Sequence, residues 1–161
     1  MIIVADSSAL VALSTCNALE FLTQLYEDVK VPQAVYDEVT VSGKPEAHSL
    51  AKFLEKRIVT VDSSQFVLAA GGLGRGEIEA MLLYKNLAAD YLLIDDRRAR
   101  ALAESNEIRC VGALGILLLA KHNRLLDQIT PFIEVLQNST LHYSKNLLEK
   151  TLQLAGERPY L

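Results

Sequence analysis

Short apolar runs alternate with amphipathic segments along most of the chain. The runs are rich in β-branched residues and end at polar ones, which predicts buried strands. We expect these strands at residues 2–5, 29–31, 58–61, 91–94 and 108–111. Elsewhere apolar residues recur at helical spacing. We expect helices from about Ser7 and at 18–26, 32–41, 46–56, 77–88, 97–105, 112–126, 131–137 and 144–155, with a glycine-containing loop at 62–76 in which 66–70 is a candidate short element.

This alternation of strands and helices predicts the class of fold. Short strands joined through helices are typical of a parallel sheet that is covered on both faces. We therefore expect an α/β protein, a three-layer α/β/α sandwich with a central parallel sheet and extra C-terminal helices. The length of 161 residues suits one domain spanning 1–161, in which 130–161 form a helical extension packed on the rest.

Composition narrows the class of protein further. Half of the residues are apolar and 22% are charged, as in soluble globular proteins. The net charge of −4 argues against a protein that coats nucleic acid through a broad basic surface. Cys16 and Cys110 form neither a zinc-ligand pattern nor a disulfide framework. The N-terminus has no signal-peptide pattern, and the run 116–120 is too short to span a bilayer, so we expect a cytoplasmic protein without membrane association.

Acidic residues follow two of the predicted strands directly. Asp6 ends the first strand, and Asp95 and Asp96 end the fourth. The carboxyl ends of parallel strands share one edge of a sheet, where open α/β sheets bind their ligands. Each acid also has an ordinary interpretation as a helix cap. Ser7 or Ser8 could cap in place of Asp6, however, and only one of the two later aspartates is needed for the next helix.

Three glutamates on predicted helices could join these aspartates. Glu38 shares a face with Ala34 and Val35, where a carboxylate is costly unless it is paired, binds a metal or reaches water at the edge. Glu77 and Glu79 open a helix that is apolar nearly all round. In the ordinary interpretation, their negative charges interact favourably with the partial positive charge of the helix N-terminus. They lie two positions apart and point to opposite sides, so at most one faces a given site.

Together these acids predict a divalent-metal site. Clustered carboxylates repel one another unless a cation neutralises them, and hard oxygen ligands suit Mg²⁺ or Mn²⁺. Such ions activate water and stabilise charge on a phosphodiester. Arg75, Arg97, Arg98 and Arg100 lie near the acids and could hold phosphates. A solvated helix face with Asp/Arg pairing is the alternative interpretation of these arginines.

Several segments, in their order and spacing, resemble the PIN-domain nuclease family. More narrowly, they are similar to the prokaryotic PIN-like branch of nucleic-acid-binding and toxin-type proteins. The matching segments are 3–10 (IVADSSAL), 31–39 (VPQAVYDEV), 74–80 (GRGEIEA), 92–98 (LLIDDRR), 111–115 (VGALG) and the tail ending AGE at 155–157.

The resemblance implies a function and a set of site residues. It implies an α/β/α fold, Mg²⁺- or Mn²⁺-dependent cleavage of single-stranded RNA, often a toxin role opposed by a small antitoxin, and a homodimer. The four acids of the family fall on Asp6, on Glu38, on Glu79 with Glu77 as the near alternative, and on Asp96 with Asp95 adjacent. This chain departs from the commoner pattern by having Glu at the third position and paired Asp at the fourth.

Three functional hypotheses follow. In the leading one, an endoribonuclease, Asp6, Glu79 and Asp96 hold the ion while Glu38 orients or deprotonates the attacking water. The alternative is a catalytically inactive PIN-like module that binds nucleic acid or a partner protein. A phospho-acceptor fold is disfavoured. A receiver domain needs paired acids after its first strand, and a haloacid-dehalogenase-type phosphatase needs an aspartate where Ser8 stands.

Overall fold

A five-stranded parallel sheet forms the centre of the molecule. The computed structural model describes residues 1–61 and 72–158, so the candidate element at 66–70 lies outside the described residues. The strand order is β3-β2-β1-β4-β5, and every neighbouring pair is parallel. β1 lies in the middle, where Ile3 pairs with Val29 on one side and with Tyr91 on the other. The strands are β1 (Ile2–Ala5), β2 (Asp28–Pro32), β3 (Ile58–Val59), β4 (Tyr91–Leu93) and β5 (Cys110–Val111).

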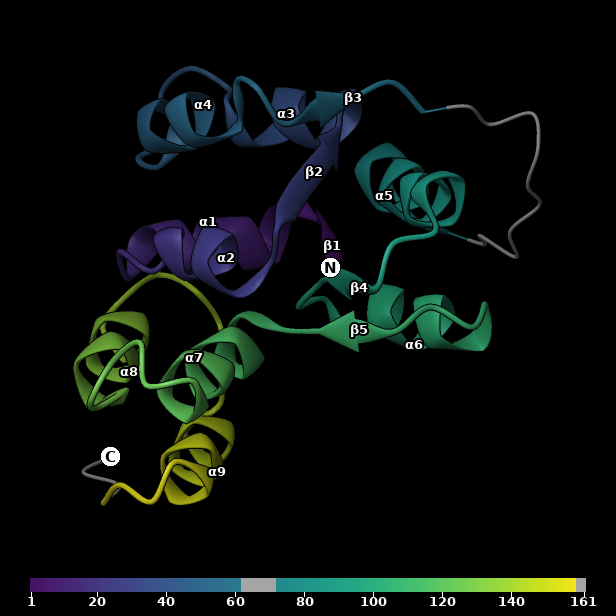
Figure 1. The fold of residues 1–161 in the computed structure, drawn as a ribbon. Helices are drawn as coiled ribbons and strands as arrows, with labels where there is room; N and C mark the ends of the chain where they lie inside the picture. The colour runs from purple at the N-terminus through teal and green to yellow at the C-terminus, as the bar shows by residue number, and fades with distance from the viewer. Residues whose placement is uncertain (62–71, 159–161) are drawn as a thin grey trace.

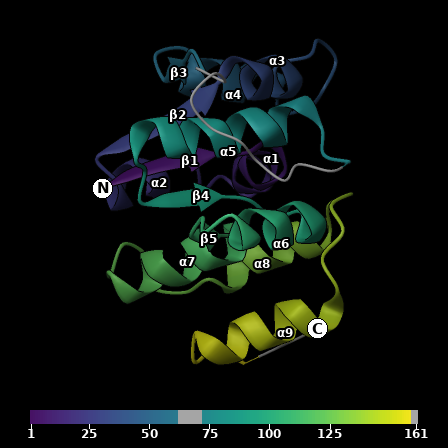
Figure 2. The same cartoon turned by 90° about the vertical axis from the view of Figure 1, so that its right-hand side faces the viewer.

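Helices cover both faces of this sheet. Figure 1 shows the sheet nearly edge-on, with α1 and α2 on one face and α5 and α6 on the other; Figure 2 shows α5 and α6 in front of the strands. This arrangement confirms the predicted three-layer α/β/α sandwich. The helices are α1 (Ser7–Thr15), α2 (Glu20–Leu25), α3 (Gln33–Val39), α4 (Ala47–Leu54), α5 (Arg75–Leu87), α6 (Arg97–Ser105), α7 (Ala113–His122), α8 (Thr130–Gln137) and α9 (Lys145–Leu154).

Some boundaries differ from the predicted ones for local reasons. Pro32 was expected to be the first helical residue, but its extended backbone (φ −76°, ψ 161°) ends β2 instead. Helix α5 begins at Arg75, two residues earlier than expected. It does so because the Glu77 carboxylate accepts a hydrogen bond from the Gly74 N–H at 2.9 Å, which satisfies a donor at the helix start.

The C-terminal helices pack on the main body of the domain. α8 contacts α1, and α9 contacts α7 and α8. The Phe21 and Phe132 rings meet edge to face, with centroids 5.7 Å apart. The Glu157 carboxylate, which is 7% exposed, accepts hydrogen bonds from the N–H groups of Ile129 and Thr130 and pairs with Lys121 at 2.8 Å. This carboxylate therefore ties the chain after α9 to the start of α8.

Helix length and polarity also bear on the membrane prediction. Among residues 1–61 and 72–158, the structure has no helix that is both long and apolar enough to cross a membrane.

Candidate active site

Asp6 is a buried carboxylate at the carboxyl edge of the sheet. Its backbone continues the ladder of β1, since its N–H donates to the Leu93 carbonyl at 2.8 Å. Asp6 occupies the position before α1, yet its side chain makes no capping hydrogen bond. The residue is only 2% exposed, and its Oδ1 atom has no hydrogen-bond partner among the described residues. The cap interpretation therefore does not account for this aspartate.

Burial perturbs the protonation of Asp6 strongly. Loss of hydration raises its pKa from 3.8 to about 7. The backbone of Ser7 offsets part of this shift, whereas the charges of Glu77, Glu38 and Asp96 raise the pKa further. A carboxyl group with such a pKa is half ionised near neutral pH. It is a favourable ligand for a cation, because a cation stabilises the ionised form.

Glu38 and Ser7 face each other across this edge. The Ser7 hydroxyl donates a hydrogen bond to Glu38 Oε2, which joins the first turn of α1 to α3. Gly76 of α5 lies beside the same carboxylate, because a Cβ at that position would be 3.4 Å from Glu38 Oε2. Glu38 itself is exposed, so its carboxylate stands at the mouth of the site.

The structure separates the two glutamates at the start of α5. Glu77 turns toward Asp6, and its charge acts on that carboxylate. Glu79 lies on another side of the helix, where Oε2 pairs with Arg75 at 2.7 Å and Oε1 accepts from the Ala34 N–H at 3.4 Å. Glu79 therefore links α5 to the start of α3, and Glu77 is the one that joins the acidic cluster.

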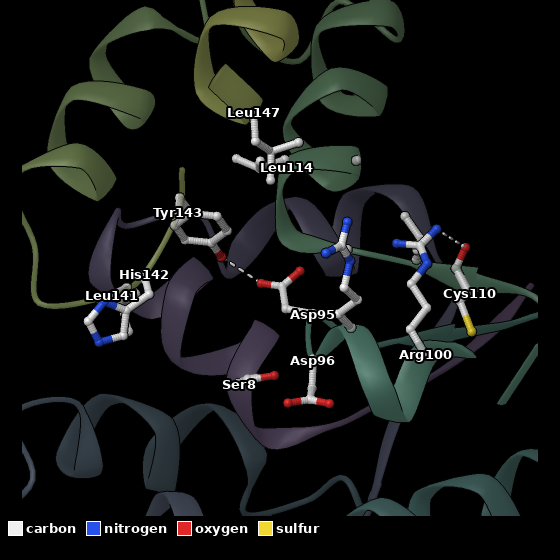
Figure 3. Close-up of a pocket in the computed structure, with 14 residues that line it drawn as sticks. Ser8, Asp95, Asp96, Arg100, Cys110, Leu114, Leu141, His142, Tyr143 and Leu147 are labelled. Atoms are coloured by element: carbon white, nitrogen blue, oxygen red, sulfur yellow. Dashed lines mark hydrogen bonds between the residues drawn. The ribbon is translucent and has the colours of Figure 1, made fainter. Parts of the chain in front are cut away.

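Asp95 and Asp96 leave β4 in opposite directions, as Figure 3 shows. Asp95 accepts hydrogen bonds from the Ala113 N–H at 2.9 Å and from the Tyr143 hydroxyl at 2.5 Å. Asp96 points toward the side of Ser8, and its Oδ1 caps α6 through the Ala99 N–H at 2.8 Å. Asp95 therefore links the end of β4 to the start of α7 and to Tyr143. Asp96 caps α6 and lines the same pocket as Asp6.

Four carboxylates line one small pocket at this edge. The pocket has a volume of about 210 Å³, and its acidic members are Asp6, Glu38, Glu77 and Asp96. We call it the acidic pocket. Within residues 1–61 and 72–158, the structure contains no group of three or more His, Cys, Asp or Glu side chains arranged to hold a metal ion directly. Ser7, Gly74 and Ala99 each donate a hydrogen bond to one of the three carboxylates other than Asp6.

The donor set nevertheless fits a hydrated divalent cation. Each carboxylate has about four lone-pair positions, so a single hydrogen bond leaves acceptor capacity. Mg²⁺ commonly keeps several of its waters and takes only one or two carboxylates from the protein. Asp6 supplies a buried oxygen that has no donor in the described part of the chain, and the other three carboxylates supply oxygens in the same pocket.

The predicted phosphate-binding arginines occupy three different places. Arg75 lines the acidic pocket and is held by Glu79. Arg97 and Arg100 line a larger cavity next to it. Arg98 packs against the backbone of Gly72.

Residues that sequence reasoning did not single out complete this region. The Ser7 hydroxyl holds Glu38, although its place after Asp6 had indicated only a helix cap. Tyr143, in the C-terminal extension, binds Asp95 from 48 positions away. No local pattern connects those two residues, so only the folded chain reveals the contact.

The parallel sheet with helices on both faces is a nuclease-type α/β fold, and a comparison with family models agrees. The model of the PIN domain matches residues 2–157. The chain therefore belongs to the PIN-domain family, whose members are generally nucleases and usually use divalent metals. Comparisons with curated proteins and with solved structures gave no match.

Proposed function

We propose that this protein is an endoribonuclease that uses Mg²⁺ or Mn²⁺ to cut single-stranded RNA in the acidic pocket. The observation that carries the proposal is the buried Asp6 carboxylate. Its Oδ1 has no hydrogen-bond donor within residues 1–61 and 72–158, and three further carboxylates line the same pocket. Burial of a charge without a partner is costly, so such a residue is retained where a cation balances it. The family resemblance adds a toxin role, a small antitoxin partner and a homodimer to the proposal.

Each acidic residue has a role in this proposal. Asp6 would bind the ion directly, and Asp96 and Glu77 would bind it through their remaining lone pairs or through its waters. When bound, the ion would supply an activated water and would stabilise negative charge on the phosphodiester. Glu79 and Asp95 are assigned to holding the structure, because neither lines the acidic pocket and their oxygens bind donors on other segments.

In this proposal Glu38 would accept the proton of the attacking water. The Ser7 hydroxyl fixes its Oε2 and leaves Oε1 to accept that proton. The water oxygen would then form a bond to phosphorus while the bond to the leaving oxygen breaks, and the leaving oxygen would take up a proton from solvent water. Arg75, with a side chain 79% exposed and held by Glu79, would contact the phosphate at the pocket mouth.

Cleavage of labelled single-stranded RNA tests this proposal. Wild-type protein should cut in Mg²⁺ or Mn²⁺ and stop when EDTA is added. Asp6→Asn should lower the rate by about a hundredfold or more. Asp28→Asn, an exposed aspartate at the opposite end of β2, is the matched control and should cut normally.

A second pair of variants separates the two glutamates of α5. Glu77→Gln should lower cleavage by about tenfold, whereas Glu79→Gln should change it by less than about threefold. Equal cleavage by wild type and Asp6→Asn would refute the proposal. RNA binding that persists in EDTA, with no cleavage in Mn²⁺, would identify a binding module in place of an enzyme.

A further inference from the structure

A second and larger cavity adjoins the acidic pocket. Figure 3 shows the residues that line this larger cavity. Its volume is about 650 Å³. Ser8 and Asp96 line both cavities, so the two spaces meet at the carboxyl edge of the sheet. The walls come from α6, from the start of α7, from the segment 141–143 and from the start of α9. We call this space the side cavity.

The walls of the side cavity combine apolar surface with positive charge. Leu114 and Leu147 lie close together on one side in Figure 3, with the Tyr143 ring nearby. Leu147 is 45% exposed, so its side chain is accessible from the cavity. Arg97 and Arg100 supply positive charge from α6, where Arg100 also pairs with Glu104 at 3.1 Å. Asp95 and Asp96 add negative charge to the lining. The cavity therefore offers an apolar surface for a flat ring system and cations for a phosphate.

Asp95 does not oppose an anionic ligand as strongly as its charge suggests. Its two oxygens accept hydrogen bonds from the N-terminus of α7 at Ala113 and from the Tyr143 hydroxyl. A helix N-terminus carries partial positive charge, which offsets the carboxylate. The hydrogen bond between the Tyr143 hydroxyl and Asp95 also fixes the position of the Tyr143 ring, so this wall of the cavity is formed without a ligand.

We propose that the side cavity binds one nucleotide of the single-stranded RNA, the nucleotide next to the phosphodiester that lies in the acidic pocket. The inference rests on the proposed function, because it takes the acidic pocket as the place of cleavage. The base would pack against Leu114, Tyr143 and Leu147, and its phosphate would contact Arg97 or Arg100. A cavity of this size is typical of small-ligand sites, and proteins bind single strands by pairing apolar or aromatic surfaces with arginines.

The shape of the site favours a single strand over a duplex. A base can enter a cavity only when it is unstacked and unpaired, which is the usual condition for recognition of RNA by side chains. The side cavity would therefore distinguish single-stranded RNA from duplex RNA before cleavage occurs.

Two matched substitutions on α9 test the base-binding wall. Leu147→Glu places a negative charge in the side cavity, whereas Leu154→Glu places the same charge on the same helix at a side chain that is 69% exposed and outside this cavity. The probe is a fluorescein-labelled single-stranded RNA of about 12 nucleotides, measured by fluorescence anisotropy in EDTA. Leu147→Glu should raise Kd by about tenfold, and Leu154→Glu by less than about twofold.

A second pair tests the phosphate contact. Arg97→Ala should weaken binding and reduce the salt dependence of log K by about 0.7, the value for one phosphate contact in a single strand. Arg109→Ala, which removes an exposed arginine outside the side cavity, should leave the salt dependence unchanged. Duplex RNA of the same sequence should bind more weakly than the single strand to wild-type protein.

The outcomes distinguish this inference from the proposed function. If Leu147→Glu and Arg97→Ala bind and cut RNA like their controls, the side cavity does not hold a nucleotide, while the acidic pocket keeps its assignment. Absence of RNA binding by the wild type would also overturn the inference. Failure of the proposed function has a different signature, because Asp6→Asn would then cut as fast as wild type.

Discussion

Replacement of Asp6 by Asn should change how stability depends on pH. Burial and neighbouring carboxylates raise the pKa of Asp6 from 3.8 to about 7. The folded protein therefore holds this proton more tightly than the unfolded chain does. As pH rises through this interval, the unfolded chain ionises first and the free energy of unfolding falls. At about 1.4 kcal/mol per pKa unit, the free energy of unfolding falls by on the order of 4 kcal/mol. This decrease is absent below about pH 4 and complete above about pH 7.

The amide in Asp6→Asn does not titrate, so the variant avoids this loss. In EDTA near pH 8, the variant should be more stable than wild type by up to about 4 kcal/mol, and the difference should vanish near pH 4. Urea unfolding at about pH 8 and about pH 4 measures the stability of both proteins. Far-UV circular dichroism is the signal, because the chain contains no tryptophan for fluorescence. Asp28→Asn, at an exposed position, is the control and should follow the wild-type curve.

A divalent ion should reduce or reverse the difference in stability between Asp6→Asn and wild type near pH 8. In the proposed function Mn²⁺ would bind the ionised Asp6 carboxylate only in the folded protein, so it should raise the stability of wild type near pH 8 and have little effect on Asp6→Asn. The reasoning would be refuted if the two proteins showed the same pH dependence in EDTA. It would also be refuted if Mn²⁺ stabilised both proteins equally.

Three further predictions concern the segments around the site. Glu157→Gln should cost about 3 kcal/mol near neutral pH. Burial raises the pKa of Glu157, but hydrogen bonds from Lys121 and from the start of α8 outweigh burial and lower this pKa from 4.5 to about 2. In urea unfolding, the difference in stability between wild type and Glu157→Gln should therefore shrink as pH falls below about 4.5. Gly112→Ala should lower Tm, because its Cβ would lie 2.6 Å from the Asp95 carboxylate. Tyr143→Phe should cost about 1–3 kcal/mol in the same assay, because Asp95 loses a donor.

The sheet and its helices could be predicted from local pattern. Runs such as 91–94 and 97–105 carry the periodicity of their elements, and the parallel arrangement follows from their alternation. Asp6 and Asp96 were also accessible to this reasoning, because they follow strands that end at one edge. The precise boundaries depended on contacts such as that between Glu77 and Gly74.

The direction of individual side chains could not be predicted in this way. Glu79 turns away from Asp6 because the Ala34 N–H, 45 positions earlier, and Arg75 bind it. Asp95 turns away because its partners lie 18 and 48 positions later in the chain. Such partners are set by the tertiary structure, so the choice between adjacent acids requires the folded chain.

The most direct test of the central claim is the position of a bound metal ion. Crystals of the wild-type protein soaked in Mn²⁺ and measured at a wavelength where manganese scatters anomalously would locate the ion. We predict one anomalous peak in the acidic pocket, coordinated by Asp6 and adjacent to Asp96 and Glu77, and no such peak in Asp6→Asn crystals. A peak on Glu79 or Asp95 away from Asp6, or no peak in the wild type at a saturating concentration, would contradict the account.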